Sequence, residues 1–273
     1  MNRPLVLKFG GELIEDPARL AVVVAAIAKV AAAGTPLVVV HGGGREIDAA
    51  LKTAGITKRQ VDGLRITDAA TLDVVVSVLA GAVNTRLVAA LATAGVNAVG
   101  LTGADGRCGL SAVAPPHASA DGPVDLGLVG VPTAAANLRL LETLVGNGFV
   151  PVIASIGIDA RGGLLNVNAD TFAGHLAARL RARRLVIAGT TPGVLDAAGA
   201  TLPDIDAAGI ARLVDDRTAT AGMVAKLRAC GHALAAGVDD VVIVNGGDGE
   251  ALVAAATGET PGGATRLVST VNA

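Results

Sequence analysis

Lys8 is the first residue whose type and position could support chemistry, because it closes an apolar run and two glycines follow one residue later. An apolar run that ends in Gly10-Gly11 predicts a buried strand with a tight turn at its carboxyl end. Burying an unpaired ammonium is costly, so we expect an anion to meet Lys8. The alternative is a strand-end lysine that extends its ammonium to solvent.

A second glycine-rich turn, His41-Gly42-Gly43-Gly44, follows an apolar strand and precedes a helix. Consecutive glycines at such a junction leave backbone N–H groups uncovered and direct them, with the helix N-terminus, at a phosphate or carboxylate. The alternative is a simple tight turn. A dinucleotide fingerprint is excluded because its third glycine would fall on Ile47, and a P-loop is excluded because no lysine follows a glycine.

Further along the chain, other polar residues could also bind a ligand. Arg65 follows the hairpin signal Asp62-Gly63, and its planar guanidinium suits a carboxylate, although an exposed hairpin arginine is the simpler interpretation. Asn168 and Asp170 are explained as the cap and first turn of a helix, but that role leaves Asn166 unexplained. We therefore expect the side chains of Asn166, Asn168 and Asp170 to orient a polar ligand and neighbouring lysines.

The elements that must position these residues alternate in type. Strands that are apolar throughout, alternating with helices, predict a parallel sheet covered on both faces. Ligands bind such sheets beyond the carboxyl ends of the strands, so both glycine turns should line one crevice. Strands are expected at 5–9, 36–40, 96–101, 150–154, 185–188, 241–244 and 265–268, with short ones around Asp105-Gly106 and from 124 to 129. Helices are expected at 17–33, 45–54, 68–94 with an irregularity at Gly81, up to 147, 169–182 and 223–236.

Composition excludes several classes of protein. The chain has 273 residues, 52% hydrophobic and 17% charged, with a net charge of −2, which suits one large domain or two lobes. Three phenylalanines without Trp or Tyr provide no stacking platform, and no basic tract is present, so no nucleic-acid partner is expected. The longest apolar helical run, 20–28, is broken by Lys29 and is far shorter than the ~20 residues of a membrane span, and no signal peptide is evident. Two isolated cysteines fit a reducing cytoplasm. We expect a cytoplasmic protein with no membrane partner.

Six motifs together carry a resemblance to a known family. They are Lys8-Phe9-Gly10-Gly11, His41-Gly42-Gly43-Gly44, Gly63-Leu64-Arg65-Ile66-Thr67, Asn166-Val167-Asn168-Ala169-Asp170, Gly193-Val194-Leu195-Asp196 and Gly222-Met223-Val224-Ala225-Lys226. In this order, over nearly the whole chain, they resemble the N-acetylglutamate kinases of the amino acid kinase family. Each motif alone is weak, but the set is specific.

The resemblance implies an α/β fold, a three-layer αβα sandwich with an open, mainly parallel central sheet. It implies an N-terminal lobe, 1–182, that binds N-acetyl-L-glutamate and dimerises, and a C-terminal lobe, 183–273, that binds ATP with Mg²⁺. The reaction would phosphorylate the side-chain carboxylate to give N-acetyl-L-glutamyl 5-phosphate, the second step of arginine biosynthesis. The partners would be these two small molecules and a second copy of the chain.

The resemblance also assigns roles by motif position. Lys8 and Lys226 would stabilise the transferring phosphoryl group, with Asp170 organising both lysines. No protein side chain is expected to bind the metal. The acetylated amino acid would contact Gly43, Gly44, Arg65 and Asn166. The nucleotide would contact Gly10, Gly11, Thr190, Gly193, Val194, Leu195, Thr218, Thr220 and Met223.

The chemistry is consistent with these roles. Attack of a carboxylate on the γ-phosphoryl of ATP brings two anions together, so their repulsion must be offset. No general base is required, because a carboxylate is already deprotonated at neutral pH. Catalysis then reduces to alignment and electrostatic stabilisation, which lysines, glycine N–H groups and magnesium supply.

Three departures from the family pattern leave alternatives open. Thr190-Thr191 stand where Asp-Val is usual, Ala221 replaces a common Gly or Asp, and Thr85 replaces a usual lysine. All three lie outside the expected phosphoryl-transfer core. One alternative is a sibling kinase for acetylated or carrier-bound aminoadipate, because one methylene provides only ~1–3 kcal/mol of discrimination. The other is a weakly catalytic ligand sensor of the same fold.

An expectation on assembly follows from the position of Lys8. Arginine-inhibited members of the family carry an extra N-terminal helix ahead of the lysine strand. Met1 to Pro4 could form at most about one turn, and Pro4 can only begin a helix. We therefore expect a homodimer that is built through the N-terminal lobe and is insensitive to arginine.

Overall fold

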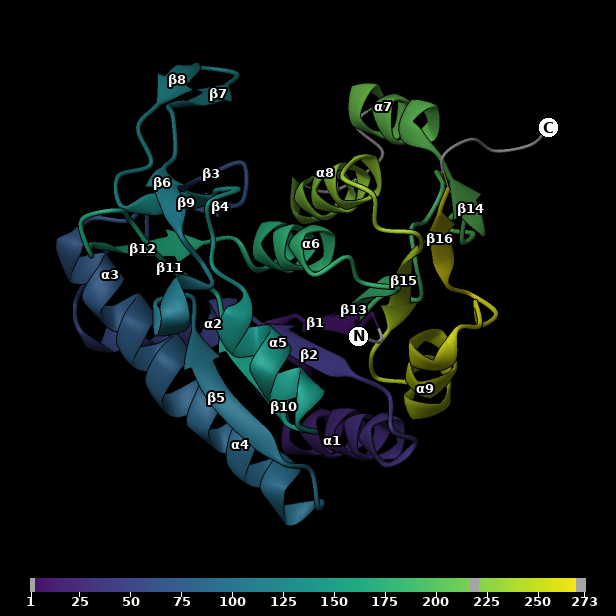
Figure 1. Ribbon diagram of the computed structural model, residues 1–273. Helices are drawn as coiled ribbons and strands as arrows, with labels where there is room; N and C mark the ends of the chain where they lie inside the picture. Colours follow the sequence, from purple (N-terminus) through teal and green to yellow (C-terminus); the bar gives the residue numbers. More distant parts are fainter. Residues whose placement is uncertain (1–2, 217–220, 269–273) are drawn as a thin grey trace.

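The computed structural model describes residues 3–216 and 221–268. A single eight-stranded sheet runs through the molecule in the order β14-β16-β15-β13-β1-β2-β10-β5 (Figure 1). Neighbouring strands are parallel except for β15 and β16, so the predicted open, mainly parallel sheet is confirmed. Its strands are β1 Leu5–Phe9, β2 Leu37–His41, β5 Ala98–Thr102, β10 Val150–Ala154, β13 Arg184–Gly189, β14 Asp204–Ile205, β15 Val241–Asn245 and β16 Thr265–Leu267.

Helices cover both faces of this sheet, as predicted (Figure 1). One face packs against α5 Arg139–Gly146, α6 Ala169–Arg179 and α8 Ala221–Ala235, and the other against α1 Pro17–Ala32, α4 Asn84–Thr93 and α9 Gly249–Thr257. Successive side chains of a strand point to opposite faces. Val6 belongs to the first core and Leu7 to the second, so Lys8 projects from the same face as Val6, towards α6.

β1 is the seam between the two halves of the chain. It pairs in parallel with β2 on one side and with β13 on the other, so Lys8 lies opposite Val40 and Ile187. The strands on the β2 side all precede residue 155, and those on the β13 side all follow residue 183. The expectation that both halves share a continuous sheet is therefore confirmed.

Helix starts follow the predicted capping residues. The side chains of Asp16, Asp68 and Asn168 accept hydrogen bonds from the first turns of α1, α3 Ala69–Val76 and α6. The predicted irregularity at Gly81 is the π-helix η2 Ser77–Val83, which joins α3 to α4. α2 Gly44–Thr53 begins directly in the glycine turn.

The segment between β5 and α5 differs from the prediction. Asp105-Gly106 lies in a 3-10 helix, η3 Asp105–Arg107, because the Asp105 carboxylate accepts bonds from the N–H and hydroxyl of Thr102. Of the predicted strand at 124–129, the two ends lie in strands, Val124 in β8 and Val129 in β9, and residues 125–128 form the loop between them. The observed strands here are β6 Ser111–Val113, β7 His117–Ser119, β8 Gly122–Val124 and β9 Val129–Pro132.

Other elements were not predicted. β11 Ile156–Ile158 and β12 Leu164–Val167 join β6 and β9 in a second, four-stranded sheet. β14, α7 Ala207–Asp215 and α9 complete the second half of the chain. The hairpin signal at Asp62-Gly63 is confirmed by β3 Gln60–Val61 and β4 Leu64–Arg65.

The expectation that 20–28 is the longest apolar helical run is wrong. The continuous helical run Ala69–Thr93 has 25 residues, with a mean hydropathy of 1.9 in an 18-residue window of which 33% is buried. By length and composition alone, it could cross a membrane. A single helix of this kind is weak evidence for a span, because core helices of soluble proteins meet the same criteria.

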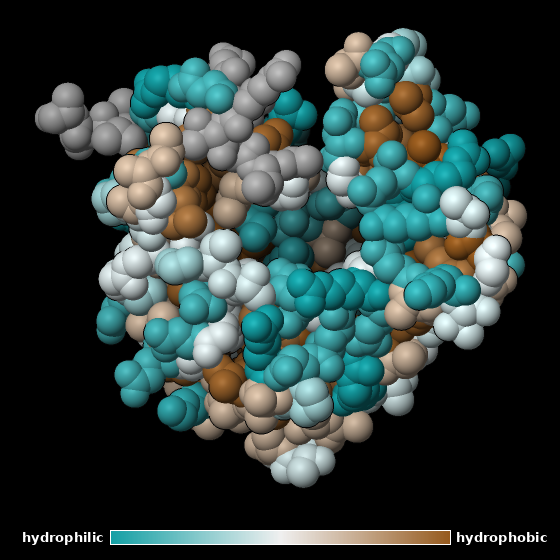
Figure 2. All heavy atoms as spheres, turned by 180° about the vertical axis from the view of Figure 1, so that it is seen from behind, coloured by the Kyte–Doolittle hydropathy of each residue, from teal (hydrophilic) through white to brown (hydrophobic). Residues whose placement is uncertain are grey.

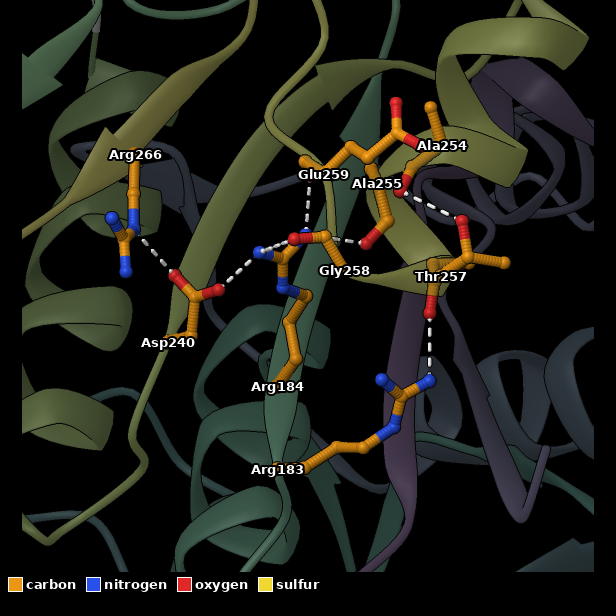
Figure 3. Close-up of polar contacts among 10 residues, drawn as sticks. Arg183, Arg184, Asp240, Ala254, Ala255, Thr257, Gly258, Glu259 and Arg266 are labelled. Carbon is orange, nitrogen blue, oxygen red and sulfur yellow. Dashed lines mark hydrogen bonds and ion pairs between the residues drawn. The ribbon is translucent and has the colours of Figure 1, made fainter.

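A buried arginine ties the start of β13 to the end of α9 (Figure 3). Arg184 donates to the carbonyl oxygens of Ala255 at 2.7 Å and Gly258 at 2.8 Å, and it forms an ion pair with Asp240. Asp240 also accepts from Arg266 at 2.8 Å. Guanidinium donors at this position satisfy carbonyls that have no partner within the helix, and their charge favours its C-terminus.

Candidate functional site

A cleft of about 500 Å³ opens where the carboxyl ends of β1, β2 and β13 meet the second sheet. Seen from behind, it is a hollow lined largely by hydrophilic residues (Figure 2). Most of the residues that the sequence singled out line it: Lys8, Gly10, Gly11, Gly43, Gly44, Arg65, Asn166, Asp170, Thr190, Met223 and Lys226. Side chains that are far apart in the sequence therefore meet in one cleft.

Three of the expected nucleotide contacts do not line this cleft. Gly193 packs against Thr265, and the N–H of Val194, which is buried, donates to the Thr265 hydroxyl at 2.8 Å. Leu195 is exposed and bridges to Thr201. Gly193 and Val194 are thus held to β16. Thr218 and Thr220 lie outside the described residues.

Lys8 and Asp170 form a buried ion pair at the floor of the cleft. The Nζ of Lys8 lies 2.7 Å from Oδ1 of Asp170, and the two residues are 7% and 8% exposed. Asp170 is held by α6, whose first turn is capped by Asn168. The expected anionic partner of Lys8 is therefore present, and the alternative of a solvent-directed lysine is wrong.

Lys226 approaches the same point from α8. Its Nζ lies 3.0 Å from the place that a Cβ atom on Gly189 would occupy, so the bare end of β13 makes room for the ammonium. Burial and the nearby charge of Lys8 lower the pKa of Lys226, while Asp170 and Glu12 partly offset that shift. Two cations from separate elements thus face one cleft, with carboxylates beside them.

The two glycine turns pack directly against each other. A Cβ atom on Gly11 would lie 2.8 Å from the Cα of Gly43, and one on Gly43 would lie 2.8 Å from the side chain of Leu79 in the π-helix. Side chains on either glycine would separate the turns. The N–H groups of Gly10 and Gly42 donate to the carbonyls of Ala188 and Phe9, whereas those of Gly11, Gly43 and Gly44, which line the cleft, have no partner among the described residues.

His41 supports this second turn from below. Its Nδ1 donates to the carbonyl oxygen of Gly42 at 3.1 Å, and its Nε2 accepts from the Asn84 amide at 3.0 Å. Because the amide nitrogen can only donate, this geometry assigns the neutral tautomer with its proton on Nδ1. Burial lowers the pKa of His41 to about 4. The turn therefore rests on an uncharged imidazole at neutral pH.

One terminal nitrogen of the Arg65 guanidinium is hydrogen-bonded, and the other is not. Its Nη2 donates to Asp48 at 2.5 Å and to the Gly44 carbonyl at 3.4 Å, whereas Nη1 is buried without a hydrogen-bond partner. Lys58 binds the second oxygen of Asp48 at 2.7 Å. Burial raises the pKa of Asp48, but the bonds from Lys58 and Arg65 outweigh it and lower that pKa. Arg65 lines the cleft, and a guanidinium nitrogen without a partner is suited to a carboxylate.

Asn166 lies at the same end of the cleft. It is the third residue of β12, and its amide donates to the Thr67 hydroxyl at 3.0 Å. Thr67 immediately precedes the Asp68 cap of α3 and is fully buried. This bond orients the amide, which leaves its oxygen as an acceptor for a polar ligand.

Sequence reasoning missed several residues of this site. Glu12 and Ser155 line the cleft, and Asp48 and Thr67 position the side chains that do. Glu12 directly follows the first glycine turn, which was a usable signal. The role of Asp48 had no such signal, because it depends on how the β3–β4 hairpin docks on α2.

The lining of the cleft combines two sets of groups. One set is the two lysines, Asp170 and the glycine turns, and the other is Arg65, Asn166 and the apolar side chains of Ile47, Leu64, Leu79, Val129 and Val167. The first set suits a transferring phosphoryl group, and the second suits a small molecule with a carboxylate and an apolar part. Within the described part of the chain, no three His, Cys, Asp or Glu side chains are grouped to bind a metal.

Comparisons with known proteins agree with this geometry. The model of the amino acid kinase family matches residues 3–245. The chain is 41% identical over 250 residues to the acetylglutamate kinase of Erythrobacter litoralis, covering 90% of this chain and 83% of that relative. It is 42% identical over 255 residues to the acetylglutamate kinase of Novosphingobium aromaticivorans, covering 90% and 84%.

Solved structures share the fold. smu.665 from Streptococcus mutans UA159 superimposes with a TM-score of 0.79 at 29% identity, covering 90% of this chain and 96% of that one. The N-acetylglutamate synthase of Neisseria gonorrhoeae, complexed with coenzyme A and N-acetyl-glutamate, gives a TM-score of 0.82 at 24% identity, covering 99% of this chain and 60% of that one. The second likeness bears on the fold alone.

Proposed function

The chain belongs to the amino acid kinase family, and from that premise we propose that it phosphorylates N-acetyl-L-glutamate with ATP. The product is N-acetyl-L-glutamyl 5-phosphate, and the reaction is the second step of arginine biosynthesis. The observation that carries this proposal is the buried Lys8–Asp170 pair, which lies in one cleft with Lys226 and the two apposed glycine turns.

The substrate carboxylate needs no general base, because it is ionised at neutral pH. The free Nη1 of Arg65 and the amide of Asn166 bind the acetylated amino acid, and the backbone of Gly43 and Gly44 orients its reacting end. This places the side-chain carboxylate in line with the γ-phosphoryl group.

Lys8 and Lys226 then stabilise the charge that spreads over the phosphoryl oxygens in the transition state. Asp170 keeps the ammonium of Lys8 in place and moderates the repulsion between the two lysines. Gly10, Gly11, Thr190 and Met223 contact the nucleotide from the other side of the cleft. Gly193, Val194, Leu195, Thr218 and Thr220 complete the border of the nucleotide site in this proposal.

Mg²⁺ enters with ATP, and bound there it screens the phosphate charges. The unpartnered N–H groups of Gly11, Gly43 and Gly44 fit the phosphates that would carry the ion. The lobe of residues 1–182 binds the amino acid substrate, and the lobe of residues 183–273 binds the nucleotide.

The protein forms a homodimer through its N-terminal lobe in the cytoplasm. The supporting feature is the long helical run 69–93, which lies along the outside of this lobe with most of its apolar window unburied (Figure 1). A second copy of the same helix would cover that surface. The two buried free cysteines are compatible with a reducing compartment.

An ADP-release assay tests the proposal. We expect turnover with N-acetyl-L-glutamate and none with glutamate, aspartate or UMP. Preference for acetylaminoadipate would indicate the sibling kinase. Binding of N-acetyl-L-glutamate without ADP release, measured by calorimetry, would indicate a ligand sensor and would exclude the proposed catalysis.

A further inference from the structure

Glu12 places a carboxylate in the cleft, near Lys226. It lies in the 3-10 helix η1 Gly11–Leu13, directly after the first glycine turn. Its two carboxylate oxygens lie 2.3 and 2.4 Å from the position that a Cβ atom on Gly10 would take. The carboxylate therefore folds back over bare backbone, into space that any other residue at position 10 would fill.

No other side chain holds this carboxylate. The contact from Arg19 goes to the main-chain oxygen of Glu12, at 3.3 Å, and not to the side chain. Among the described residues, no hydrogen bond or ion pair to the carboxylate is formed. Glu12 nevertheless lies close enough to Lys226 for its charge to raise the pKa of that lysine.

The charges around Glu12 indicate what its carboxylate is suited to bind. Lys8 is neutralised by Asp170, and Glu12 opposes the charge of Lys226. The described lysines thus leave little net positive charge for an incoming triphosphate. Divalent cations in kinase sites are held by one or two carboxylates together with substrate phosphates. Asp170 is paired with Lys8 through Oδ1, whereas the Glu12 carboxylate has no ion-pair partner among the described residues.

We propose that Glu12 is a ligand of the divalent cation that accompanies the nucleotide. This inference rests on the proposed function, and it departs from the sequence-based expectation that no side chain would bind the metal. It also explains why Gly10 is bare: the carboxylate needs that space in order to face the phosphates. Without the cation, the Glu12 carboxylate repels the triphosphate and weakens nucleotide binding. With the cation bound, the same carboxylate strengthens nucleotide binding.

Nucleotide binding tests this without turnover. Calorimetry with the non-hydrolysable analogue AMP-PNP, in EDTA and in Mg²⁺, should show that Mg²⁺ strengthens binding to the unaltered protein. Glu12→Gln should bind metal-free AMP-PNP more tightly, and its gain from Mg²⁺ should fall about tenfold, since one charged contact is worth ~1.5 kcal/mol or more. Glu250→Gln, an equal charge change at the exposed start of α9, should retain the full gain.

Gly10→Ala provides a second variant, because it keeps the negative charge but displaces the carboxylate, and it should also lose the gain. In the unaltered protein, the electron paramagnetic resonance spectrum of Mn²⁺ with AMP-PNP should differ from that of Glu12→Gln. An equal Mg²⁺ gain in Glu12→Gln and the unaltered protein would overturn this inference and leave the proposed function standing. Absence of nucleotide binding in the unaltered protein would overturn both.

Discussion

Asp48 holds Nη2 of Arg65 at 2.5 Å, while Nη1 of the same guanidinium remains buried without a partner. The bond to Nη2 thus fixes the orientation of the guanidinium, and Nη1 remains to bind a ligand. Asp48→Asn should raise KM for N-acetyl-L-glutamate about tenfold with little change in kcat, because a bond to a charged group is worth ~1.5–3 kcal/mol. Steady-state kinetics measures both constants.

Lys58→Met is the matched comparison, because it leaves the Arg65 contact in place and removes only the second partner of Asp48. Its KM should rise less. If Asp48→Asn leaves KM unchanged, Arg65 does not depend on Asp48 for its orientation.

Lys8→Met and Lys226→Met should each lower kcat about 100- to 1,000-fold, because the ammonium groups act on charge that develops in the transition state. KM should change much less. Lys52→Met, an exposed lysine in the last turn of α2, controls for the loss of one positive charge. Near-normal kcat in either variant would remove that lysine from the catalytic assignment.

Gly189→Ala should lower kcat about tenfold without lowering the unfolding midpoint, because its methyl group would lie 3.0 Å from Nζ of Lys226 and displace it. Gly146→Ala places a methyl group in open space at the end of α5 and should have no effect on turnover. Equal kcat in both variants would show that the position of Lys226 tolerates this shift.

The unfolding free energy should decrease as pH falls from 6.5 to 4. Burial lowers the pKa of His41 from 6.5 to about 4, so in this window the unfolded chain binds a proton that the folded protein does not. At 1.36 kcal/mol per pKa unit, the loss is ~3 kcal/mol. Denaturant unfolding at several pH values measures it. His41→Gln should show a shallower slope, and an unchanged slope would assign the loss to other groups.

Arg184→Met should lower the unfolding free energy by about 3 kcal/mol or more, because it leaves Asp240 and the carbonyls at the end of α9 without their buried partner. Arg183→Met removes one bond, to the Ala256 carbonyl, from a partly exposed side chain, and should cost less. Chemical denaturation compares the two variants. Equal losses would mean that the buried network contributes nothing beyond a single surface contact.

Local signals in the sequence were sufficient to predict much of this fold. The caps at Asp16, Asp68 and Asn168 mark helix starts whatever the tertiary structure, and wholly apolar strands separated by helices predict the parallel sheet. That sheet brings both glycine turns to one edge, and the need of a buried lysine for an anion anticipated the Lys8–Asp170 pair.

Contacts between segments that are distant in the sequence could not be predicted from local sequence signals. Asp48 meets Arg65 only because the β3–β4 hairpin docks on α2. Val194 is fixed outside the lining of the cleft because the hydroxyl of Thr265, far along the second half of the chain, accepts its N–H. Short elements such as β14 carry too few residues for a periodic pattern.

The seam strand has a consequence for synthesis. β1 emerges early from the ribosome and can pair with β2, but its other partner, β13, begins only at residue 184. Until then, one edge of an apolar strand presents unpaired N–H and C=O groups, which favours pairing with another nascent chain. Lys8 is the only charged residue in that strand. We therefore expect the lysine assigned to phosphoryl transfer to act first as a gatekeeper against aggregation.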